Sequence, residues 1–134
     1  MEIDADMAWP VIAVARFMAQ GEEAGLAEAF APGAVVVENF PPFLFEGPDA
    51  FERWRDGFIT RSRLLELEDL QFEIGHAQDF TRGEDRAFFT LPVRWTGFAL
   101  GRPFDERGGW SFVLVRASAR WRILCYAWGV TAKS

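Results

Sequence analysis

Residues 35–57 carry the feature that most restricts the fold of this chain. The segment starts with three consecutive valines, which favour an extended strand because β-branched side chains pack well on a pleated surface. The strand leads into Phe40–Phe43, whose two prolines lack backbone donors and stiffen the chain into a loop. Gly47 and Pro48 then open a helix. This order predicts a sheet packed on a helix layer with a cavity between them.

Short helices precede this unit and long aromatic strands follow it. Apolar residues spaced three and four apart predict the helices, and alternating apolar and polar residues predict the strands. The expected helices span residues 9–20, 22–30 and 48–63, the expected strands span 34–40, 67–80, 86–98, about 110–115 and 121–130, and the turns fall at 82–85, 100–102 and 117–119. We therefore expect one α+β domain over residues 1–134, with a curved antiparallel sheet wrapped around the N-terminal helices and enclosing a pocket.

Prolines and glycines mark irregular points within these elements. Pro10 is expected in the first turn of the first helix, where its missing N–H does least harm. Pro92 lies within an expected strand and predicts a bulge or an unpaired stretch. Gly108 and Gly109 predict a second bulge that bends the sheet.

Charge and composition argue against several functional classes. The net charge is −6 and no patch of Lys and Arg is visible, so we expect no nucleic acid partner. Cys125 is the one cysteine, which excludes an internal disulfide, and a single histidine argues against a zinc site. We expect no metal and no cofactor. No apolar run approaches membrane-spanning length and the first residues do not resemble a signal peptide, so we expect no membrane partner and a cytoplasmic location.

Aromatic residues make up 16% of the chain, with fourteen Phe and six Trp. Such a content indicates a thick core, a lined cavity, an apolar dimer face, or a combination of these. Both faces of the expected last strand are apolar: Leu124, Tyr126 and Trp128 fall on one, and Trp121, Ile123 and Cys125 on the other. One face is expected to meet the helices and the pocket. A second copy of the chain is the simplest partner for the other, so we expect a homodimer through the outer sheet face.

Five short segments, in this order, resemble the NTF2-like superfamily, also called the SnoaL-like or cystatin-like cone fold. They are Ala34–Asn39, Gly47–Phe51, Gly83–Ala87, Gly101–Phe104 and Ala119–Ile123. The resemblance covers nearly the whole chain and implies a single cone-shaped domain. It implies little about function, because this fold hosts isomerases, dehydratases, epoxide hydrolases, polyketide cyclases and subunits without chemistry of their own.

The ketosteroid isomerases of that superfamily provide one pattern for comparison. Their oxyanion-donating tyrosine would fall on Phe17, which has no hydroxyl, and their basic aspartate on Asn39, an amide. Their protonated aspartate would fall near Trp110, whose indole N–H can still donate a hydrogen bond. Two of the three roles are absent, so this chain is not expected to follow that mechanism.

His76 and Asn39 are the candidate catalytic side chains. His76 follows Leu70, Phe72 and Ile74 on the expected inner face and has the one side chain that ordinarily titrates near neutral pH. Asn39 would orient a ligand through its amide, or instead stabilise a turn. The expected ligand-binding set, which could equally be plain core, is Phe17, Phe43, Trp54, Phe58, Phe89, Trp95, Trp110, Tyr126 and Trp128.

Three charged residues allow both a functional and a structural interpretation. Glu38 ends the first strand beside Asn39, and one of the two should point inward, so Glu38 is a second candidate base. Arg94 interrupts an apolar strand, where it could clamp a carboxylate, remain solvated on the outer face, or pair across the sheet. Asp105 is better explained as part of a surface salt-bridge cluster.

The leading hypothesis from the sequence is a homodimeric cone-fold protein that binds a small, largely apolar molecule of aromatic or polyketide-like character. An alternative is a cofactor-independent lyase, isomerase or hydrolase that uses His76. A further alternative is a non-catalytic subunit that pairs with another chain through its sheet face.

Overall fold

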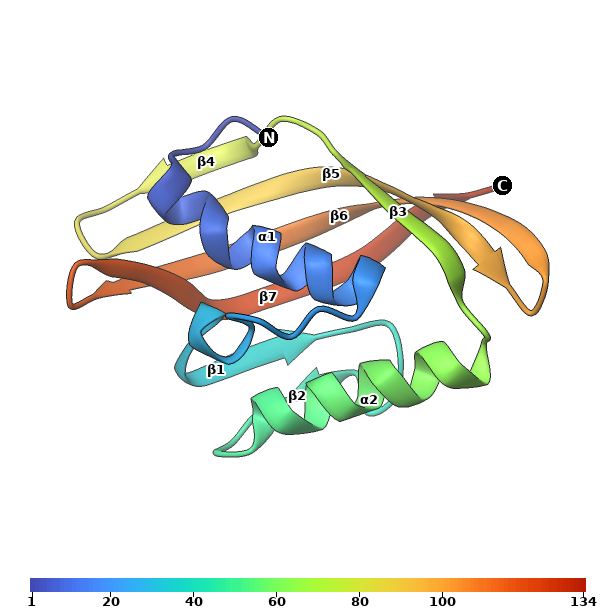
Figure 1. Cartoon of the computed structure of the whole chain (residues 1–134). Coiled ribbons are helices and arrows are strands. Elements are labelled where there is room, and N and C mark those ends of the chain that lie inside the picture. Colours follow the sequence, from blue (N-terminus) through green and yellow to red (C-terminus); the bar gives the residue numbers. More distant parts are fainter.

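The computed structural model describes residues 1–134 as two α-helices, one 3₁₀ turn and a seven-stranded sheet (Figure 1). The helical elements are α1 (Ala5–Gln20), η1 (Ala27–Ala29) and α2 (Ala50–Leu64). The strands are β1 (Phe30–Val37), β2 (Leu44–Phe45), β3 (Glu68–Ile74), β4 (Gln78–Arg82), β5 (Arg86–Ala99), β6 (Arg102–Ala117) and β7 (Arg120–Lys133). The predicted α+β class is confirmed.

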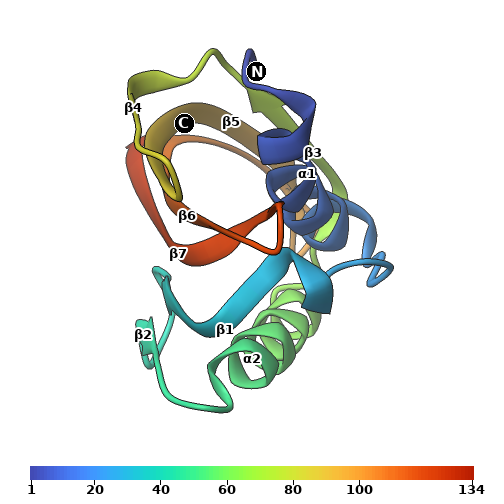
Figure 2. The same ribbon diagram turned by 90° about the vertical axis from the view of Figure 1, so that its left-hand side faces the viewer.

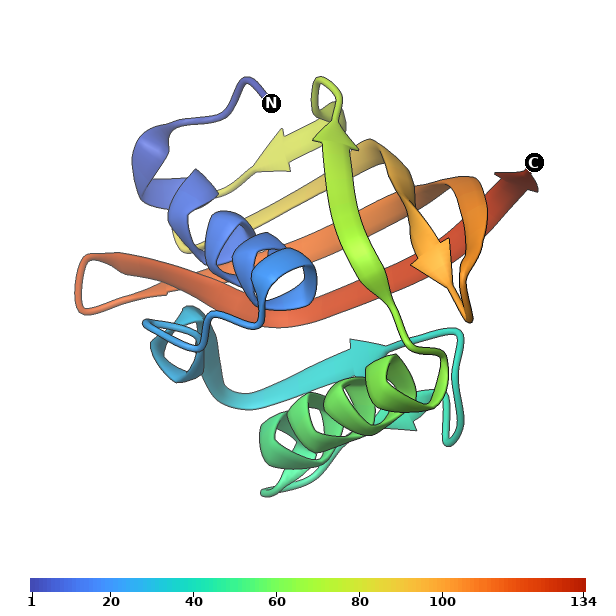
Figure 3. The same ribbon diagram turned by 45° about the vertical axis from the view of Figure 1, so that its right-hand side comes forward.

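The strands follow the order β2-β1-β7-β6-β5-β3, and β4 pairs with β5 beside β3. All neighbours are antiparallel except β1 and β7, which are parallel. The long strands β5, β6 and β7 curl strongly, with α1 at their side and α2 along β1 (Figure 2). In Figure 3, β3 passes in front of β6 and β7, which shows how far the sheet bends toward the helices.

Helix α1 starts four residues earlier than its apolar pattern predicts. The Asp4 carbonyl accepts hydrogen bonds from the N–H groups of Met7 and Ala8 at 2.9 and 2.8 Å, and both side chains are buried. Burial of this first turn outweighs the presence of Pro10, which is the sixth residue of the helix rather than part of its first turn. The helix ends at Gly21, which has a left-handed φ of 70° and whose N–H donates to the Phe17 carbonyl.

The helix expected over residues 22–30 is wrong. Only Ala27–Ala29 form a 3₁₀ turn, and β1 begins at Phe30. Residues 22–25 are all exposed, so this stretch has no apolar face that would stabilise a helix, and Gly25 has a left-handed φ of 74°.

The strand expected over residues 67–80 is two strands separated by Gly75–Ala77. Pro92 on β5 explains the break. The Pro92 carbonyl accepts a hydrogen bond from the Gly75 N–H at 2.8 Å, so the nitrogen of Pro92 also points toward this break. Because proline has no N–H, β5 offers no donor there to pair with a continuous strand. Pro92 nevertheless remains in register with Gly109 on β6, so the predicted irregularity lies between β3 and β4 rather than within β5.

Two register shifts between β6 and β7 decide which side chains face inward. The first, between Arg107 and Gly108, lies at the predicted Gly108–Gly109 bulge, although the extra residue belongs to β7. The second leaves Leu124 as an extra residue opposite Val113 and Leu114. Consequently Ile123 and Tyr126 are both fully buried, which corrects the expectation that they lie on opposite faces.

Aromatic rings fill the space between the concave side of the sheet and the helices. The largest fully buried side chains are Trp54, Trp110, Trp121, Tyr126, Phe45, Phe89 and Phe112. No helix of the chain has both the length and the apolar character that crossing a membrane requires. The core continues to one end of the cone, where it opens into a pocket.

Candidate functional site

A pocket of about 160 Å³ lies where β1, β3 and the β5–β6 hairpin meet the last turns of both helices. Eleven of its sixteen lining residues are hydrophobic. The aromatic ones are Phe40, Phe58, Phe72, Trp95, Phe104, Trp110 and Trp128, and the polar ones are Glu38, Asn39, Arg61, Ser62 and Glu106. A small apolar chamber with a few polar groups is the usual form of a small-molecule site.

Glu38 follows β1 on its buried side. Ala34, Val36 and Glu38 are buried in alternation, so the strand period carries the carboxyl group inward and leaves Asn39 exposed. The aromatic loop holds this position, because the Glu38 N–H donates to the Phe43 carbonyl at 2.9 Å and the Phe43 N–H donates to the Phe40 carbonyl at 2.8 Å.

Two core side chains donate hydrogen bonds to the same oxygen of Glu38. Trp54 Nε1 donates to Oε2 at 3.0 Å, and the Tyr126 hydroxyl donates to Oε2 as well. Oε1 receives neither of these bonds. When the carboxyl group is neutral, its proton is therefore expected on Oε1, and when it is ionised, Oε1 is the oxygen free of both side-chain donors.

Burial controls the ionisation of this group. Glu38 is only 4% exposed, and its desolvation raises the pKa of the carboxyl above its ordinary value, although bonds from Tyr126 and Trp54 oppose this. Burial and the nearby Glu38 carboxylate raise the pKa of Tyr126 well above its ordinary value, so its hydroxyl remains a hydrogen-bond donor. The geometry thus provides a carboxyl group that is more basic than an exposed glutamate.

Two residues of the pocket lining each carry a buried polar atom that has no partner within the protein. Trp110 Nε1 is one, although Trp110 is only 1% exposed, and Ser62 Oγ is the other. The Trp110 ring is fixed by edge-to-face contacts with Tyr126 and Trp128 at 5.8 and 6.5 Å and by stacking on Phe72 at 5.9 Å. An immobile buried N–H without an acceptor is costly unless water or a ligand accepts its hydrogen bond.

Two charged side chains complete the pocket lining. Arg61 is exposed, lies over the Phe40 ring at 5.6 Å, and its charge lowers the pKa of Glu38. Glu106 is half-buried and forms no ion pair. No group of three or more His, Cys, Asp or Glu side chains is arranged to hold a metal ion.

The structure brings five of the predicted site residues together in the pocket lining: Asn39, Phe58, Trp95, Trp110 and Trp128. Trp54 and Tyr126 do not line the pocket, but both donate hydrogen bonds to Glu38, which does. Phe17 is buried core, 5.5 Å from the rings of both Trp54 and Phe58. Phe89 is also core, and Phe43 is 55% exposed at the loop tip.

The expected position of His76 on the inner face is wrong. Strand β3 ends at Ile74, so the alternation that runs through Leu70 and Phe72 no longer applies at residue 76. The His76 side chain is 74% exposed, and its Nδ1 lies 3.6 Å from Glu2 near the N-terminus. It is absent from the pocket, and we assign it no catalytic role.

Four of the five polar residues in the pocket lining were missed or underrated by sequence reasoning. The sequence makes Glu38 a candidate base, but three successive valines hide which strand face is buried. Arg61, Ser62 and Glu106 carried no signal, because each follows from how the end of α2 and the β5–β6 hairpin approach one another. The Leu100 N–H donates to the Leu65 carbonyl at 2.8 Å and fixes that approach.

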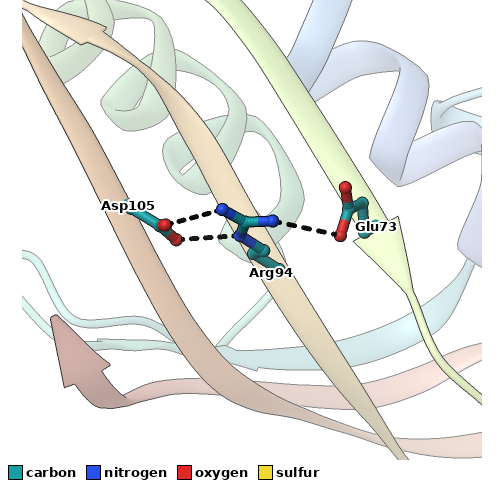
Figure 4. Close-up of polar contacts among 3 residues, drawn as sticks. All are labelled: Glu73, Arg94 and Asp105. Carbon is teal, nitrogen blue, oxygen red and sulfur yellow. Dashed lines mark hydrogen bonds and ion pairs between the residues drawn. The ribbon is translucent and has the colours of Figure 1, made fainter. Parts of the chain in front are cut away.

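Arg94 pairs across the sheet, outside the pocket (Figure 4). Its Nε and Nη2 donate to the two oxygens of Asp105 at 3.1 and 2.8 Å, and its Nη1 lies 3.7 Å from Glu73. These contacts raise the pKa of Arg94 and lower the pKa of Asp105. Its fork is already occupied by a carboxylate of the same chain, so it is not available to clamp a ligand in this arrangement.

A scan against protein-family models and a search of curated proteins give no match. The fold, by contrast, is shared with many solved structures. Among them are the hexachlorocyclohexane dehydrochlorinase LinA-type3 from Novosphingobium barchaimii, with a TM-score of 0.77, 9% identity and coverage of 93% of this chain and 84% of that one. A provisionally assigned ketosteroid isomerase from Shewanella frigidimarina matches with a TM-score of 0.74 and 19% identity, over 94% of this chain and 96% of that one. An NTF2-like protein with a cystatin-like fold from Novosphingobium aromaticivorans matches with a TM-score of 0.73 and 16% identity, over 93% of this chain and 79% of that one.

Proposed function

We propose that this chain, which has the NTF2-like cone fold, binds a small and mainly apolar ring-containing molecule in the pocket beside Glu38. The observation that carries the proposal is Trp110 Nε1, a buried donor without an acceptor on a residue that lines the aromatic chamber. A ligand with a carbonyl or hydroxyl oxygen supplies the missing acceptor, and its apolar body is held by the surrounding rings.

The pocket volume sets the scale of the ligand. A closed apolar cavity of about 150 Å³ is known to hold one benzene ring. At about 160 Å³ this chamber accommodates one ring of similar size, and because it is open to solvent on one side, a substituent can extend outward. A second, more open hollow shares Met18, Phe58, Ser62 and Leu67 with the pocket, which gives a longer ligand room to continue.

Acetophenone and α-methylstyrene test this proposal, because they have nearly the same shape and only the first carries a carbonyl oxygen. We expect both to bind by calorimetry, with acetophenone about fivefold tighter if it gains one hydrogen bond. Trp110→Phe should remove that advantage and leave α-methylstyrene binding nearly unchanged. Absence of binding by either compound to the folded protein would refute the proposal.

Proton transfer by Glu38 is a second candidate function. Its raised pKa, its place in the pocket wall and an Oε1 free of both side-chain donors support a role as base, and the search matches include a dehydrochlorinase. The corresponding step removes a proton from a carbon beside a carbonyl or a leaving group. It replaces the role that sequence reasoning gave to His76.

Deuterium exchange into the methyl group of acetophenone, followed by NMR in D₂O, tests this second candidate. Exchange should exceed the buffer rate with the wild-type protein and fall to that rate with Glu38→Gln. Exchange that persists in Glu38→Gln would remove Glu38 from the mechanism. Binding of acetophenone without exchange would leave a pocket that binds ligands without this chemistry.

We further propose that a second copy of the chain covers the outer face of β5, β6 and β7. The exposed or half-buried apolar residues on this face are Phe88, Val113, Val115 and Cys125. The hydroxyls of Thr90 and Ser111 hydrogen-bond to each other at 2.9 Å, so they leave no unpaired polar group on it. Such a face suits an isologous contact. Light scattering should give twice the chain mass, and Val113→Arg should give one chain mass. A monomeric wild-type protein would remove the homodimer and count against the subunit hypothesis.

A further inference from the structure

Glu106 occupies an aromatic corner at the open end of the pocket. On β6 it is paired with Trp95 of β5 on one side and with Lys133 of β7 on the other, so these three side chains share a sheet face. Phe104 lies two residues earlier on the same face, and its ring centroid is 5.6 Å from that of Trp95. Glu106, Trp95 and Phe104 all line the pocket.

The carboxylate of Glu106 has no partner in the protein. No nitrogen of a basic side chain lies within 4.0 Å of it, and it accepts no side-chain hydrogen bond. The preceding residue differs, because Asp105 on the other face is bonded twice by Arg94. Glu106 is half-buried, so a cation that reaches its carboxylate gains a charge contact that no group of the protein already makes.

Aromatic rings beside a carboxylate favour organic cations over neutral or anionic groups. Ring faces attract an ammonium group electrostatically, most strongly when solvent is partly excluded, as in the pocket. Arg61, the one basic residue in the lining, lies on the α2 side over the Phe40 ring, and Lys133 is exposed. Neither side chain has a nitrogen within 4.0 Å of the Glu106 carboxylate.

We propose that the ligand of this pocket carries a basic nitrogen, whose ammonium group sits between the Glu106 carboxylate and the Trp95 and Phe104 rings. Trp110, in the same lining, independently carries a second polar group without a partner, the buried Nε1. This inference rests on the proposed ligand-binding function and adds a basic nitrogen to its single-ring ligand class, beside the oxygen acceptor for Trp110 Nε1. A neutral or acidic ligand of the same shape binds less well.

Three probes of nearly equal size test it: 2-phenylethylamine, 2-phenylethanol and 3-phenylpropionate, titrated by calorimetry near neutral pH. We expect the amine to bind about tenfold tighter than the alcohol, and the carboxylate to bind most weakly. Glu106→Gln should remove the preference for the amine and leave the affinity for the alcohol within about twofold. Circular dichroism and melting curves of the variant establish that it is folded.

Lys133→Met provides a second variant, which should raise the affinity for the amine where Glu106→Gln should lower it. It removes the ammonium group that faces Glu106 across the strands, so the affinity for the amine should rise about two- to fivefold. Equal binding of amine and alcohol to the wild-type protein, or an amine preference that survives in Glu106→Gln, would overturn this inference while the apolar pocket stands. Failure of all three probes to bind would overturn the inference and count against the proposed function as well.

Discussion

Trp54 Nε1 lies 3.0 Å from Glu38 Oε2, so a helix residue in the core donates to a carboxyl group that ends a strand. Tyr126, on the last strand, donates to the same oxygen. The Trp54 and Tyr126 rings meet edge to face at 5.7 Å, which fixes both donors in place. This arrangement joins β1, α2 and β7 behind the pocket, and the ionisation of one side chain therefore affects the stability of the whole domain.

Glu38 makes the stability of the protein fall as pH rises. Its folded-state pKa lies above the unfolded value of 4.5, so between those two values the folded protein keeps a proton that the unfolded chain has lost. The free energy of unfolding should therefore decrease from about pH 4.5 through the folded pKa, by about 1.4 kcal/mol for each unit of the shift. Urea unfolding of wild-type protein and Glu38→Gln across this range measures the effect.

The difference between these two proteins isolates Glu38, because Gln keeps an oxygen acceptor for Trp54 and Tyr126 and has no titrating group. Other carboxyl groups are present in both proteins and cancel. Glu46→Gln, at an exposed position without a side-chain bond, serves as the matched control and should follow the wild-type curve. A difference between wild type and Glu38→Gln that stays constant with pH would contradict the burial of an ionising group.

Tyr126→Phe removes one donor to Glu38 while the ring stays in the core. A hydrogen bond to a charged group contributes about 1.5–3 kcal/mol, so we expect the unfolding free energy to fall by that order when Glu38 is ionised. The loss should be smaller at low pH, where the carboxyl group is neutral. A double-mutant cycle with Glu38→Gln isolates the contribution of the charge, because Gln still offers an oxygen acceptor to Tyr126. An equal loss in both backgrounds would show that the charge of Glu38 adds nothing to this bond.

The order of elements was predictable because each long element has a strong period of its own. The helix over 48–63 is an example, since its apolar face at Phe51, Trp54 and Phe58 is visible in the sequence alone. The inward direction of Glu38 was not predictable, because Val35 to Val37 are equally apolar and their burial depends on β7 beside them. Local pattern therefore predicted most of the long elements, but not which face of the first strand is buried.

The faces on which His76 and Tyr126 lie depend on breaks in strand pairing, and these breaks are caused by neighbouring strands. The break at residues 75–77 follows from Pro92 on a neighbouring strand, and the extra residue Leu124 follows from the pairing of β6 with β7. Neither interruption is visible within the segment that it affects. Counting alternate residues through such a point places every later side chain on the wrong face.

Gly108→Ala should destabilise the protein, and Gly129→Ala should not. A methyl group at Gly108 would lie 2.8 Å from Trp128 Cη2 and closer still to the Gly129 carbonyl oxygen, which belongs to the paired backbone. We expect a loss of about 1–3 kcal/mol from overpacking. At Gly129 nothing lies within 4 Å of the added methyl group, so that variant should be unchanged or more stable by up to about 1 kcal/mol. Equal effects of the two would contradict the close approach of β6 and β7 at this bulge.

His76→Ala should leave both stability and ligand affinity unchanged. The side chain is 74% exposed and has no contact with the pocket, so we expect changes in unfolding free energy within about 0.5 kcal/mol. Binding of 2-phenylethanol by calorimetry should agree with the wild-type value. A severalfold loss of affinity would show that the N-terminal segment and residue 76 move into the pocket when a ligand binds, and would restore His76 as a candidate.

Asp105→Asn should reduce stability above the unfolded pKa of Asp105 and have little effect in acid. The bonds from Arg94 lower the folded-state pKa of Asp105 below 3.8, so its contribution is present above that value and is lost as pH falls through the folded pKa. Both side chains are partly exposed, so the difference should also shrink as salt screens the pair. Chemical unfolding at neutral and acid pH, each at low and high salt, measures this difference.

Arg94→Lys keeps the charge but loses the two parallel hydrogen bonds that the guanidinium group makes to Asp105. An unfolding curve identical to that of the wild-type protein would show that charge alone, rather than the paired bonds in Figure 4, stabilises this part of the sheet.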